Sequence, residues 1–306
     1  MTKPDPVNLV ITLIADAKRE RLTQAFVDSM VPTLALQGIR VDKTDWLAEE
    51  IACDLFVSSA DEHVVGAYVE DIMRDQPYDA VTQLLSHRRK KLLICDMDST
   101  MITIECIDEL ADFVGKKAEV AAITERAMNG ELNFEAALRE RVILLKGLPE
   151  VVLQQCYDER VKMMPGAKQL VQTMRHHGAH AILVSGGFTF FTSRVAAELG
   201  FHEHYANTLI VRDGKLTGEV QEPILGKEAK LRTLNGSCKK LGISADEVLA
   251  VGDGANDLPM LLAAGFGVAY HAKPVVRAQA KARINHCDLS ALLWAQEYRK
   301  EDIRHR

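Results

Sequence analysis

The 306-residue sequence has no apolar run of the roughly 20 residues that a bilayer-spanning helix needs, which argues against a membrane pump. Its first six residues lack the charged and then apolar order of an export signal, so a cytoplasmic location is the default expectation. An excess of positive charge is also missing, because the formal net charge is −6. We therefore expect neither a membrane nor a nucleic acid as partner.

Cysteine pairs of the Cys-x-x-Cys type are absent, and the ten histidines show no spacing typical of a metal site. Six cysteines are scattered along the chain, which in a reducing compartment predicts core or surface thiols rather than a disulfide framework. What the chain does have is 47% hydrophobic residues, over a length sufficient for about two domains. This composition agrees with a soluble enzyme.

Two acidic residues, Asp96 and Asp98, follow the apolar run 92–95 within the segment Asp-Met-Asp-Ser-Thr. In an extended segment, residues two positions apart point the same way, so the two carboxylates can converge. One can attack phosphorus and the other can donate and remove protons, while Mg²⁺ prefers such oxygen ligands. A turn that caps a helix explains this segment equally well when it is taken alone.

Two further apolar runs end in polar tips, which favours the catalytic interpretation. Residues 181–184 lead into Ser185 and Gly186, and residues 248–251 lead into a glycine-rich run that contains Asp253. Ligands of an open parallel sheet collect beyond the carboxyl ends of its strands, so the three tips are expected to share one crevice. There the serine and the glycine N–H would hold phosphate oxygens, and Asp253 would complete a metal site.

These segments resemble the haloacid dehalogenase superfamily of phosphotransferases and, within it, the phosphoserine phosphatase family. The matching positions are 96–100, Glu105, 138–142, 184–188, Lys230 and 251–257. The resemblance covers about residues 91–290 and implies an α/β fold with a Rossmann-like core and a parallel sheet. It also implies that Asp96 is the nucleophile, that Asp98 is the general acid and base, and that Asp96, the Asp98 main chain and Asp253 hold Mg²⁺.

Substrate recognition is assigned by the same resemblance. It gives Arg141 and Glu105 to the serine moiety, adds Asn256, and selects Lys230 over its neighbour Lys227 for the phosphoryl group. By residue type alone, Arg141 is equally well a solvated helix charge and Glu105 an acid at a helix start. Composition also leaves Lys227 a rival of Lys230.

The activity implied is Mg²⁺-dependent hydrolysis of a small phosphomonoester, O-phospho-L-serine, through an aspartyl phosphate, which is the last step of serine biosynthesis. A second hypothesis is a phosphotransferase that passes the phosphoryl group to another hydroxyl, such as that of homoserine. A third is an amino-acid-binding regulatory protein that acts chiefly through residues 1–87.

The first 87 residues predict a separate domain. Apolar and amphipathic stretches follow in the order βαββαβ, which suits a ferredoxin-like α+β sandwich and resembles ACT-type domains. A packing or dimerisation module without a ligand is the alternative, which leaves a homodimer open. The basic run 88–91 predicts a solvated boundary, after which residues 88–306 form the phosphatase domain.

Two insertions in the phosphatase domain are also expected. Helical spacing of apolar residues over about 103–160 predicts a helical cap above the crevice, able to exclude water and select the substrate. Residues 209–218 contain Asp-Gly between two apolar runs, which predicts a β-hairpin at the edge of the sheet.

Overall fold

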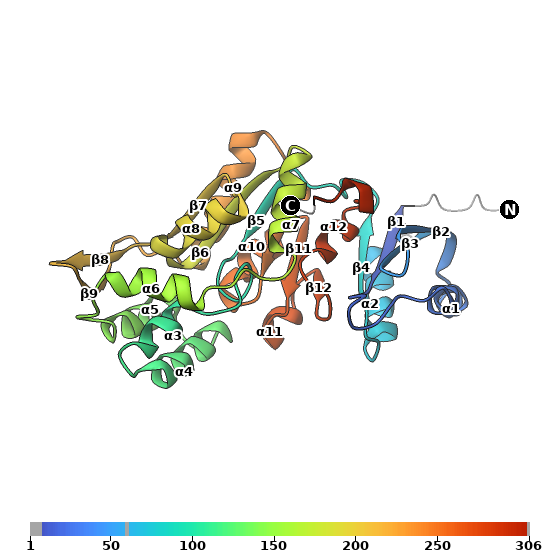
Figure 1. Ribbon diagram of the computed structural model, residues 1–306. Helices are drawn as coiled ribbons and strands as arrows, with labels where there is room; N and C mark the ends of the chain where they lie inside the picture. Colours follow the sequence, from blue (N-terminus) through green and yellow to red (C-terminus); the bar gives the residue numbers. More distant parts are fainter. Residues whose placement is uncertain (1–7, 59–60, 305–306) are drawn as a thin grey trace. The chain divides into compact units, whose positions relative to one another are not determined.

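The structure is a computed structural model that describes residues 8–58 and 61–304, so the expectation about an export signal in the first six residues lies outside the described part. The chain forms two compact units, which are coloured along the sequence in Figure 1. One unit comprises Met1–Lys90 with Ala282–Arg306, and the other comprises Lys91–Lys281. Residues 282–306, expected in the phosphatase domain, thus group with the N-terminal residues.

The first unit has the expected βαββαβ order. Its elements are β1 (Leu9–Ile14), α1 (Gln24–Ala35), β2 (Arg40–Ala48), β3 (Ala52–Ser58), α2 (Glu62–Met73) and β4 (Asp79–Leu84). The strands form an antiparallel sheet in the order β2-β3-β1-β4, with Leu13 opposite Cys53 on one side and Ala80 on the other. This is the strand order of a ferredoxin-like sandwich, so the predicted α+β fold is confirmed.

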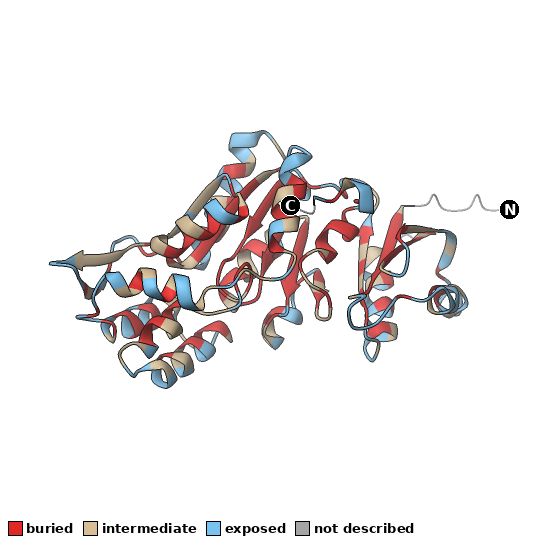
Figure 2. Cartoon of the chain, viewed as in Figure 1, coloured by how far each residue is buried: buried red, intermediate tan, exposed pale blue. Residues whose placement is uncertain are grey.

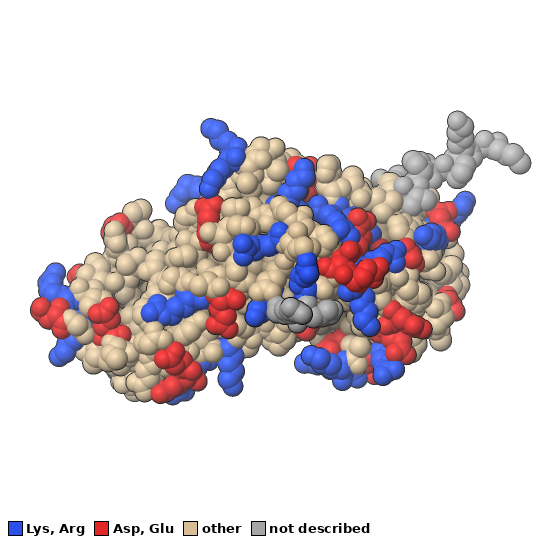
Figure 3. Space-filling model, turned by 45° about the horizontal axis from the view of Figure 1, so that its top comes forward, with Lys and Arg blue, Asp and Glu red and all other residues tan. Residues whose placement is uncertain are grey.

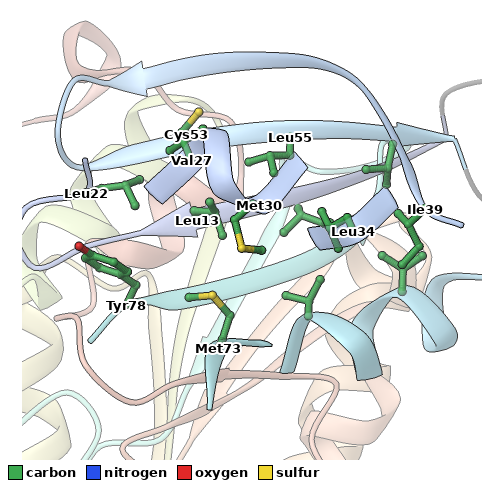
Figure 4. Close-up of a cluster of buried hydrophobic side chains, with 14 of the residues drawn as sticks. Leu13, Leu22, Val27, Met30, Leu34, Ile39, Cys53, Leu55, Met73 and Tyr78 are labelled. Atoms are coloured by element: carbon green, nitrogen blue, oxygen red, sulfur yellow. The ribbon is translucent and has the colours of Figure 1, made fainter. Parts of the chain in front are cut away.

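The alternation of side-chain direction along β1 explains how this sheet packs against its helices. Leu9, Ile11 and Leu13 point to the same face and join the apolar side chains of α1 and α2 in one buried cluster. Figure 4 shows Met30 and Leu34 of α1 close to this cluster. The intervening residues of β1 are buried as well, so the opposite face of the sheet must also be covered.

The C-terminal segment covers that opposite face. It contains β12 (Ala282–Ile284), α12 (Ala291–Ala295) and the 3₁₀ turn η3 (Lys300–Asp302). The Asp79 carboxylate accepts hydrogen bonds from the backbone N–H groups of three consecutive residues, 285 to 287, at 2.8 to 3.3 Å. The Gln83 amide donates to the Ala295 carbonyl at 2.8 Å. These contacts explain why the segment belongs to the first unit.

The expected solvated character of the run 88–91 is wrong for two of its four residues. Arg88 and Lys90 are buried, whereas the residues between and after them are exposed. Arg88 donates two parallel hydrogen bonds to the Asp54 carboxylate, at 2.8 and 3.0 Å, and one to the Thr12 hydroxyl at 3.1 Å. A buried carboxylate on β3 requires a charge partner, and Arg88 supplies it.

The second unit is built on a parallel sheet. Its strands are β5 (Leu92–Cys95), β6 (His180–Phe188), β7 (Glu203–Asn207), β10 (Val248–Gly252) and β11 (Phe266–Tyr270). They pair in parallel in the order β11-β10-β5-β6-β7. The central strands are almost wholly buried (Figure 2), as their continuous apolar runs require. The predicted Rossmann-like core is confirmed.

Helices connect and cover these strands. They are α7 (Ala167–His176), α8 (Thr189–Leu199), α9 (Lys227–Leu241), α10 (Leu258–Ala263) and α11 (Pro274–Arg277), with the 3₁₀ turns η1 (Ala245–Glu247) and η2 (Ala255–Asp257). The predicted cap is inserted after β5 and comprises α3 (Cys106–Asp112), α4 (Lys117–Met128), α5 (Phe134–Ile143) and α6 (Val151–Arg160).

The predicted hairpin exists but does not extend the main sheet. Strands β8 (Leu209–Arg212) and β9 (Lys215–Val220) form a sheet of their own. The backbone of Leu216 exchanges hydrogen bonds with the cap, from Gly147 at 2.8 Å and to Leu148 at 2.9 Å. Its side chain is buried there, so the cap, rather than the sheet edge, positions the hairpin.

None of the helices within the described residues is both long and apolar enough to cross a membrane. On the face drawn in Figure 3, Lys and Arg side chains lie among Asp and Glu side chains. No disulfide joins the six cysteines, all of which lie in the described part of the chain.

We expect Arg88→Ala to lower the free energy of unfolding by about 3 to 5 kcal/mol, because it leaves the Asp54 carboxylate buried without its partner. Arg21→Ala is the matched control in the same unit, since Arg21 pairs with Glu50 at 2.7 Å while two thirds of its side chain is exposed. Its loss should stay below about 1 kcal/mol. Urea unfolding of both variants measures the difference, and equal small losses would contradict the prediction.

Candidate active site

Three strand ends of the second unit meet at one edge of its sheet. Asp96 follows β5, Ser185 lies near the end of β6, and Asp253 follows β10. Strand β5 lies between the other two and runs parallel to both, so the residues beyond their carboxyl ends are neighbours. The structure thereby brings together the three tips that the sequence motifs identified.

Three carboxylates form the centre of this site. Oxygen atoms of Asp96, Asp253 and Asp257 all lie within 4.8 Å of one another, and the three side chains are buried. The Thr100 hydroxyl donates to Asp253 Oδ1 at 3.1 Å, and the Gly254 N–H donates to Asp257 Oδ2 at 3.1 Å. The sequence places Asp257 beside Asp253 in the same glycine-rich run but assigns it no ligand role.

Lys230 reaches this cluster from α9. Its ammonium lies 2.8 Å from Asp96 Oδ1 and 2.6 Å from Asp257 Oδ1, and the side chain is fully buried. Burial alone would lower the lysine pKa, but the charges of Asp257 and Asp96 outweigh it and raise the pKa above its usual value. Lys227 is instead exposed beside Glu228, so the fold brings Lys230 rather than its rival to the carboxylates.

One ammonium does not balance three buried carboxylates. Burial and the neighbouring charge of Asp257 raise the pKa of Asp96 well above its usual range, with Lys230 opposing the shift. The same two causes raise the pKa of Asp253 to about 7. A cluster of carboxylate oxygens with surplus negative charge is the ligand set of a hard divalent cation, so these residues fit Mg²⁺.

Asp98 is directed away from this cluster. Its Oδ1 accepts from the Cys106 N–H at 2.9 Å, and its Oδ2 accepts from the Ser185 hydroxyl at 3.3 Å. Burial raises the pKa of the Asp98 carboxyl despite these hydrogen bonds. Ser99 then adopts a left-handed backbone conformation, with φ of 54°, in the turn that follows. The two acids of the motif thus have different surroundings and can have different chemical roles.

A cavity connects these groups to the cap. Its lining includes Asp96, Asp98, Ser185, Gly186 and Asn256 from the core, and Glu105, Met128, Phe134, Leu138 and Arg141 from the cap segment. The Asn256 Oδ1 is buried and has no hydrogen-bond partner among the described residues. Every substrate-binding residue expected from the sequence except Lys230, which lies behind Asp96, therefore lines this cavity.

A basic and an acidic residue of the cap segment line the cavity. Arg141 is only 5% exposed, yet its guanidinium bonds to a backbone carbonyl and a hydroxyl and pairs with no carboxylate of the described chain. Glu105 accepts a 2.6 Å hydrogen bond from the Ser99 hydroxyl, and burial raises its pKa well above the usual value. Arg141 is therefore not the solvated helix charge that residue type alone allowed.

Apolar cap residues approach glycines of the core. A Cβ on Gly186 would lie 2.5 Å from the Phe134 ring, and one on Gly254 would lie 2.4 Å from the methyl group of Met128. Both glycines permit the cap side chains to close over the phosphate-binding tips. The sequence pattern identifies Phe134 and Met128 only as helix-packing residues, because helical spacing does not show which face meets the core.

The sequence of the parallel-sheet core matches a known protein family. Residues 93–262 match the family described as haloacid dehalogenase-like hydrolase. The chain belongs to this family. A phosphoserine phosphatase from Polaromonas sp. strain JS666 is 51% identical over 208 residues, which make up 66% of this chain and 88% of that relative. The resemblance inferred from the motifs is thereby confirmed.

Solved structures agree with this assignment. A HAD-family hydrolase from Salmonella enterica serovar Typhi has a TM-score of 0.82 at 30% identity, and the match covers 95% of this chain and 99% of that one. A phospho-aspartyl intermediate analogue of phosphoserine phosphatase has a TM-score of 0.65 at 40% identity, covering 69% of this chain and all of that one. The similarity to the Salmonella protein therefore extends over nearly the full length of both chains.

Gly187→Ala should reduce the rate of phosphomonoester hydrolysis without unfolding the protein. A Cβ at this position would lie 2.6 Å from Asp98 Oδ2 and 3.1 Å from the Ser185 hydroxyl, so the Asp98 carboxylate must move. A displacement of that size costs about 100-fold in kcat if Asp98 reacts with the substrate. We expect thermal unfolding to change little, because only the end of a side chain shifts.

Gly236→Ala is the control for this variant. Gly236 lies within α9 with nothing within 4 Å of an added Cβ, so alanine should leave kcat unchanged and stabilise the helix by about 0.5 to 1 kcal/mol. Parallel measurements of kcat and unfolding temperature test both expectations. Normal turnover by Gly187→Ala would show that the Asp98 position is not critical.

Proposed function

We propose that the chain is a Mg²⁺-dependent phosphoserine phosphatase, which hydrolyses O-phospho-L-serine to L-serine and phosphate in serine biosynthesis. The observation that carries the proposal is the cavity itself. It is lined by buried carboxylates, a serine and a glycine of the core and by the buried Arg141 of the cap, which has no carboxylate partner among the described residues. Further support comes from similar proteins that bear this name, including the Polaromonas relative.

Asp96 is the nucleophile in this mechanism. One of its carboxylate oxygens forms a bond to phosphorus while the bond between phosphorus and the seryl oxygen breaks, which gives an aspartyl phosphate. Lys230, 2.8 Å from Asp96 Oδ1, favours the ionised carboxylate needed for attack. The similar solved structure of a phospho-aspartyl intermediate analogue supports this step.

Asp98 is the general acid and then the general base. Burial raises its carboxyl pKa, which favours the protonated form that can give its proton to the departing seryl oxygen. The resulting carboxylate takes a proton from water, whose oxygen attacks phosphorus and breaks the bond to Asp96. Phosphate leaves, and both aspartates return to their starting protonation states.

Backbone and side-chain donors hold the phosphoryl oxygens. The Ser185 hydroxyl and the Gly186 N–H lie at the β6 tip, and Lys230 supplies positive charge beside Asp96. Donors placed in advance at a site that excludes water stabilise the charge of the transition state. The absent Cβ of Gly186 also leaves room for Phe134 to close this end of the cavity.

Asp96, Asp253 and the Asp98 main chain would hold the Mg²⁺, with Asp257 beside them binding Lys230. When bound, the ion screens the negative charges of the phosphate and of the carboxylates. Asp253, whose pKa is raised to about 7 by burial and the charge of Asp257, would hold the ion in its ionised form.

The serine part of the substrate is recognised by the cap. Arg141 binds the carboxylate, Glu105 binds the ammonium, and the unpartnered Asn256 Oδ1 accepts a further hydrogen bond. Arg141 and Asn256 are buried before the substrate arrives. Among the described residues Arg141 has no carboxylate partner and Asn256 Oδ1 has no hydrogen-bond partner, so the substrate would supply both. Transfer of the phosphoryl group to homoserine is not favoured, since the similar proteins are named phosphatases.

The first unit has no assigned ligand in this proposal. Its βαββαβ order continues to resemble ACT-type domains, and binding of an amino acid there stays a prediction. A cytoplasmic location and a homodimer also stay predictions.

Asp96→Asn should lower phosphoserine turnover by at least about 10,000-fold, because an amide is a poor nucleophile. The change preserves side-chain volume, so the fold should persist. Asp158→Asn, which alters an exposed acid paired with Gln154, is the control and should retain full activity. Phosphate release measures both variants, and normal turnover by Asp96→Asn would remove its assignment as nucleophile.

Arg141→Ala should lower kcat/KM for phosphoserine by at least about 30-fold, because the substrate carboxylate loses a buried charge partner. Turnover of p-nitrophenyl phosphate, which has no carboxylate, should change less than about threefold. Arg139→Ala, two positions earlier and exposed beside Glu222, is the control. Equal losses on both substrates would deny Arg141 a role in carboxylate recognition.

A further inference from the structure

A chain of hydrogen bonds joins three helices of the cap behind the substrate cavity. The Arg141 Nη1 on α5 donates to the Thr124 hydroxyl on α4 at 2.9 Å. That hydroxyl donates to Asp108 Oδ1 on α3 at 2.6 Å. Thr124 is 4% exposed and does not line the cavity, so neither it nor Asp108 belongs to the substrate-binding set described above.

The direction of the chain follows from the proton count of a hydroxyl. Thr124 has a single proton and two possible acceptors, Asp108 Oδ1 at 2.6 Å and the Val120 carbonyl at 3.0 Å. The shorter distance and the acidic acceptor favour Asp108. The hydroxyl oxygen then remains available to accept from Arg141, which completes the chain from guanidinium to carboxylate.

This chain leaves a defined part of the guanidinium for a ligand. Arg141 Nε donates to the Ala137 carbonyl at 3.0 Å, and Nη1 uses one of its two protons on Thr124. No acceptor among the described residues takes the Nη2 protons. The remaining Nη1 proton and one Nη2 proton can then serve as a parallel pair of donors to a carboxylate.

Holding an arginine side chain in one orientation costs conformational entropy, and in this fold the cost arises on folding rather than on substrate binding. A long side chain loses rotamer entropy when it is ordered. Two bonds to the protein fix Arg141 before the substrate arrives, so this loss does not weaken substrate binding.

We propose that Thr124, supported by Asp108, is a positioning residue that sets selectivity for a carboxylate-bearing phosphomonoester by orienting Arg141. The inference rests on the proposed function, because it assumes that Arg141 binds the substrate carboxylate. Thr124 acts through Arg141 and touches neither the phosphate nor the cation ligands.

A purely structural role is the alternative. A buried threonine that bonds to the carbonyl four residues earlier is ordinary within a helix, and Thr124 has that contact with Val120. In that case its hydroxyl would stabilise the cap without affecting the choice of substrate. The two explanations differ in whether KM for phosphoserine changes separately from the other kinetic constants.

The test compares Thr124→Val, which removes the hydroxyl at nearly constant volume, with Thr124→Ser, which retains it. We expect Thr124→Val to raise KM for phosphoserine about tenfold or more, the loss typical of a hydrogen bond to a charged group. The kcat for phosphoserine and kcat/KM for p-nitrophenyl phosphate should stay within about threefold. Thr124→Ser should restore KM to within about threefold of the wild-type value.

Thr233→Val is the matched control. Thr233 on α9 makes the same type of contact, to the Ala229 carbonyl at 2.9 Å, but is not part of such a chain. Thr233→Val should leave kcat and KM unchanged for both substrates. The proposal would be overturned if Thr124→Val lowered kcat/KM equally for both substrates, or if it left KM for phosphoserine unchanged.

Two further measurements keep the outcomes separate. If Thr124→Val does not fold, Asp108→Asn is measured instead. We expect this variant to raise KM for phosphoserine about threefold or more and to leave the kinetic constants for p-nitrophenyl phosphate unchanged. An unchanged KM for phosphoserine, or equal losses of kcat/KM on both substrates, would overturn the proposal. The wild-type enzyme is assayed first, because failure to prefer phosphoserine over p-nitrophenyl phosphate would reject the proposed function itself. A wild-type preference combined with an unaffected Thr124→Val variant would reject only the positioning role.

Discussion

The buried ammonium of Lys230 holds the carboxylates of the site together. It lies within 2.8 Å of both Asp96 and Asp257, and all three side chains are buried. Without it, three buried acids would repel one another and retain protons. With it, the negative charge is only partly balanced, so the cluster retains the capacity to bind a cation and to supply an ionised nucleophile.

The parallel sheet brings these groups to one place. Strands β10, β5 and β6 are adjacent and parallel, so residues 96, 185 and 253 converge although about 90 to 160 positions separate the first from the others. The cap approaches the same tips and brings the buried Arg141 and the half-buried Glu105. In the proposed function Arg141 pairs with the carboxylate of the substrate and Glu105 with its ammonium, so the cap connects the fold to its selectivity.

Local patterns predicted most of the fold. Apolar runs ending in Asp, Ser or Gly identified β5, β6 and β10, and the sequence of apolar and amphipathic stretches predicted the βαββαβ order of the first unit. The predictions failed where distant packing decides. Arg88 is buried because Asp54, 34 positions away, needs a partner, and the hairpin 209–220 lies on the cap because Leu216 packs there.

The strand ends, their order along the chain and the residue types of the site can all be read from the amino-acid sequence, because turn chemistry and side-chain periodicity act over a few residues. Long-range packing was needed to establish that Lys230 rather than Lys227 meets Asp96, that Asp257 joins the carboxylates, and that residues 282–306 cover the first unit. Those outcomes depend on which helix faces pack against which strands. The free energy of pairing a buried charge depends on that packing, and no local pattern along the chain records it.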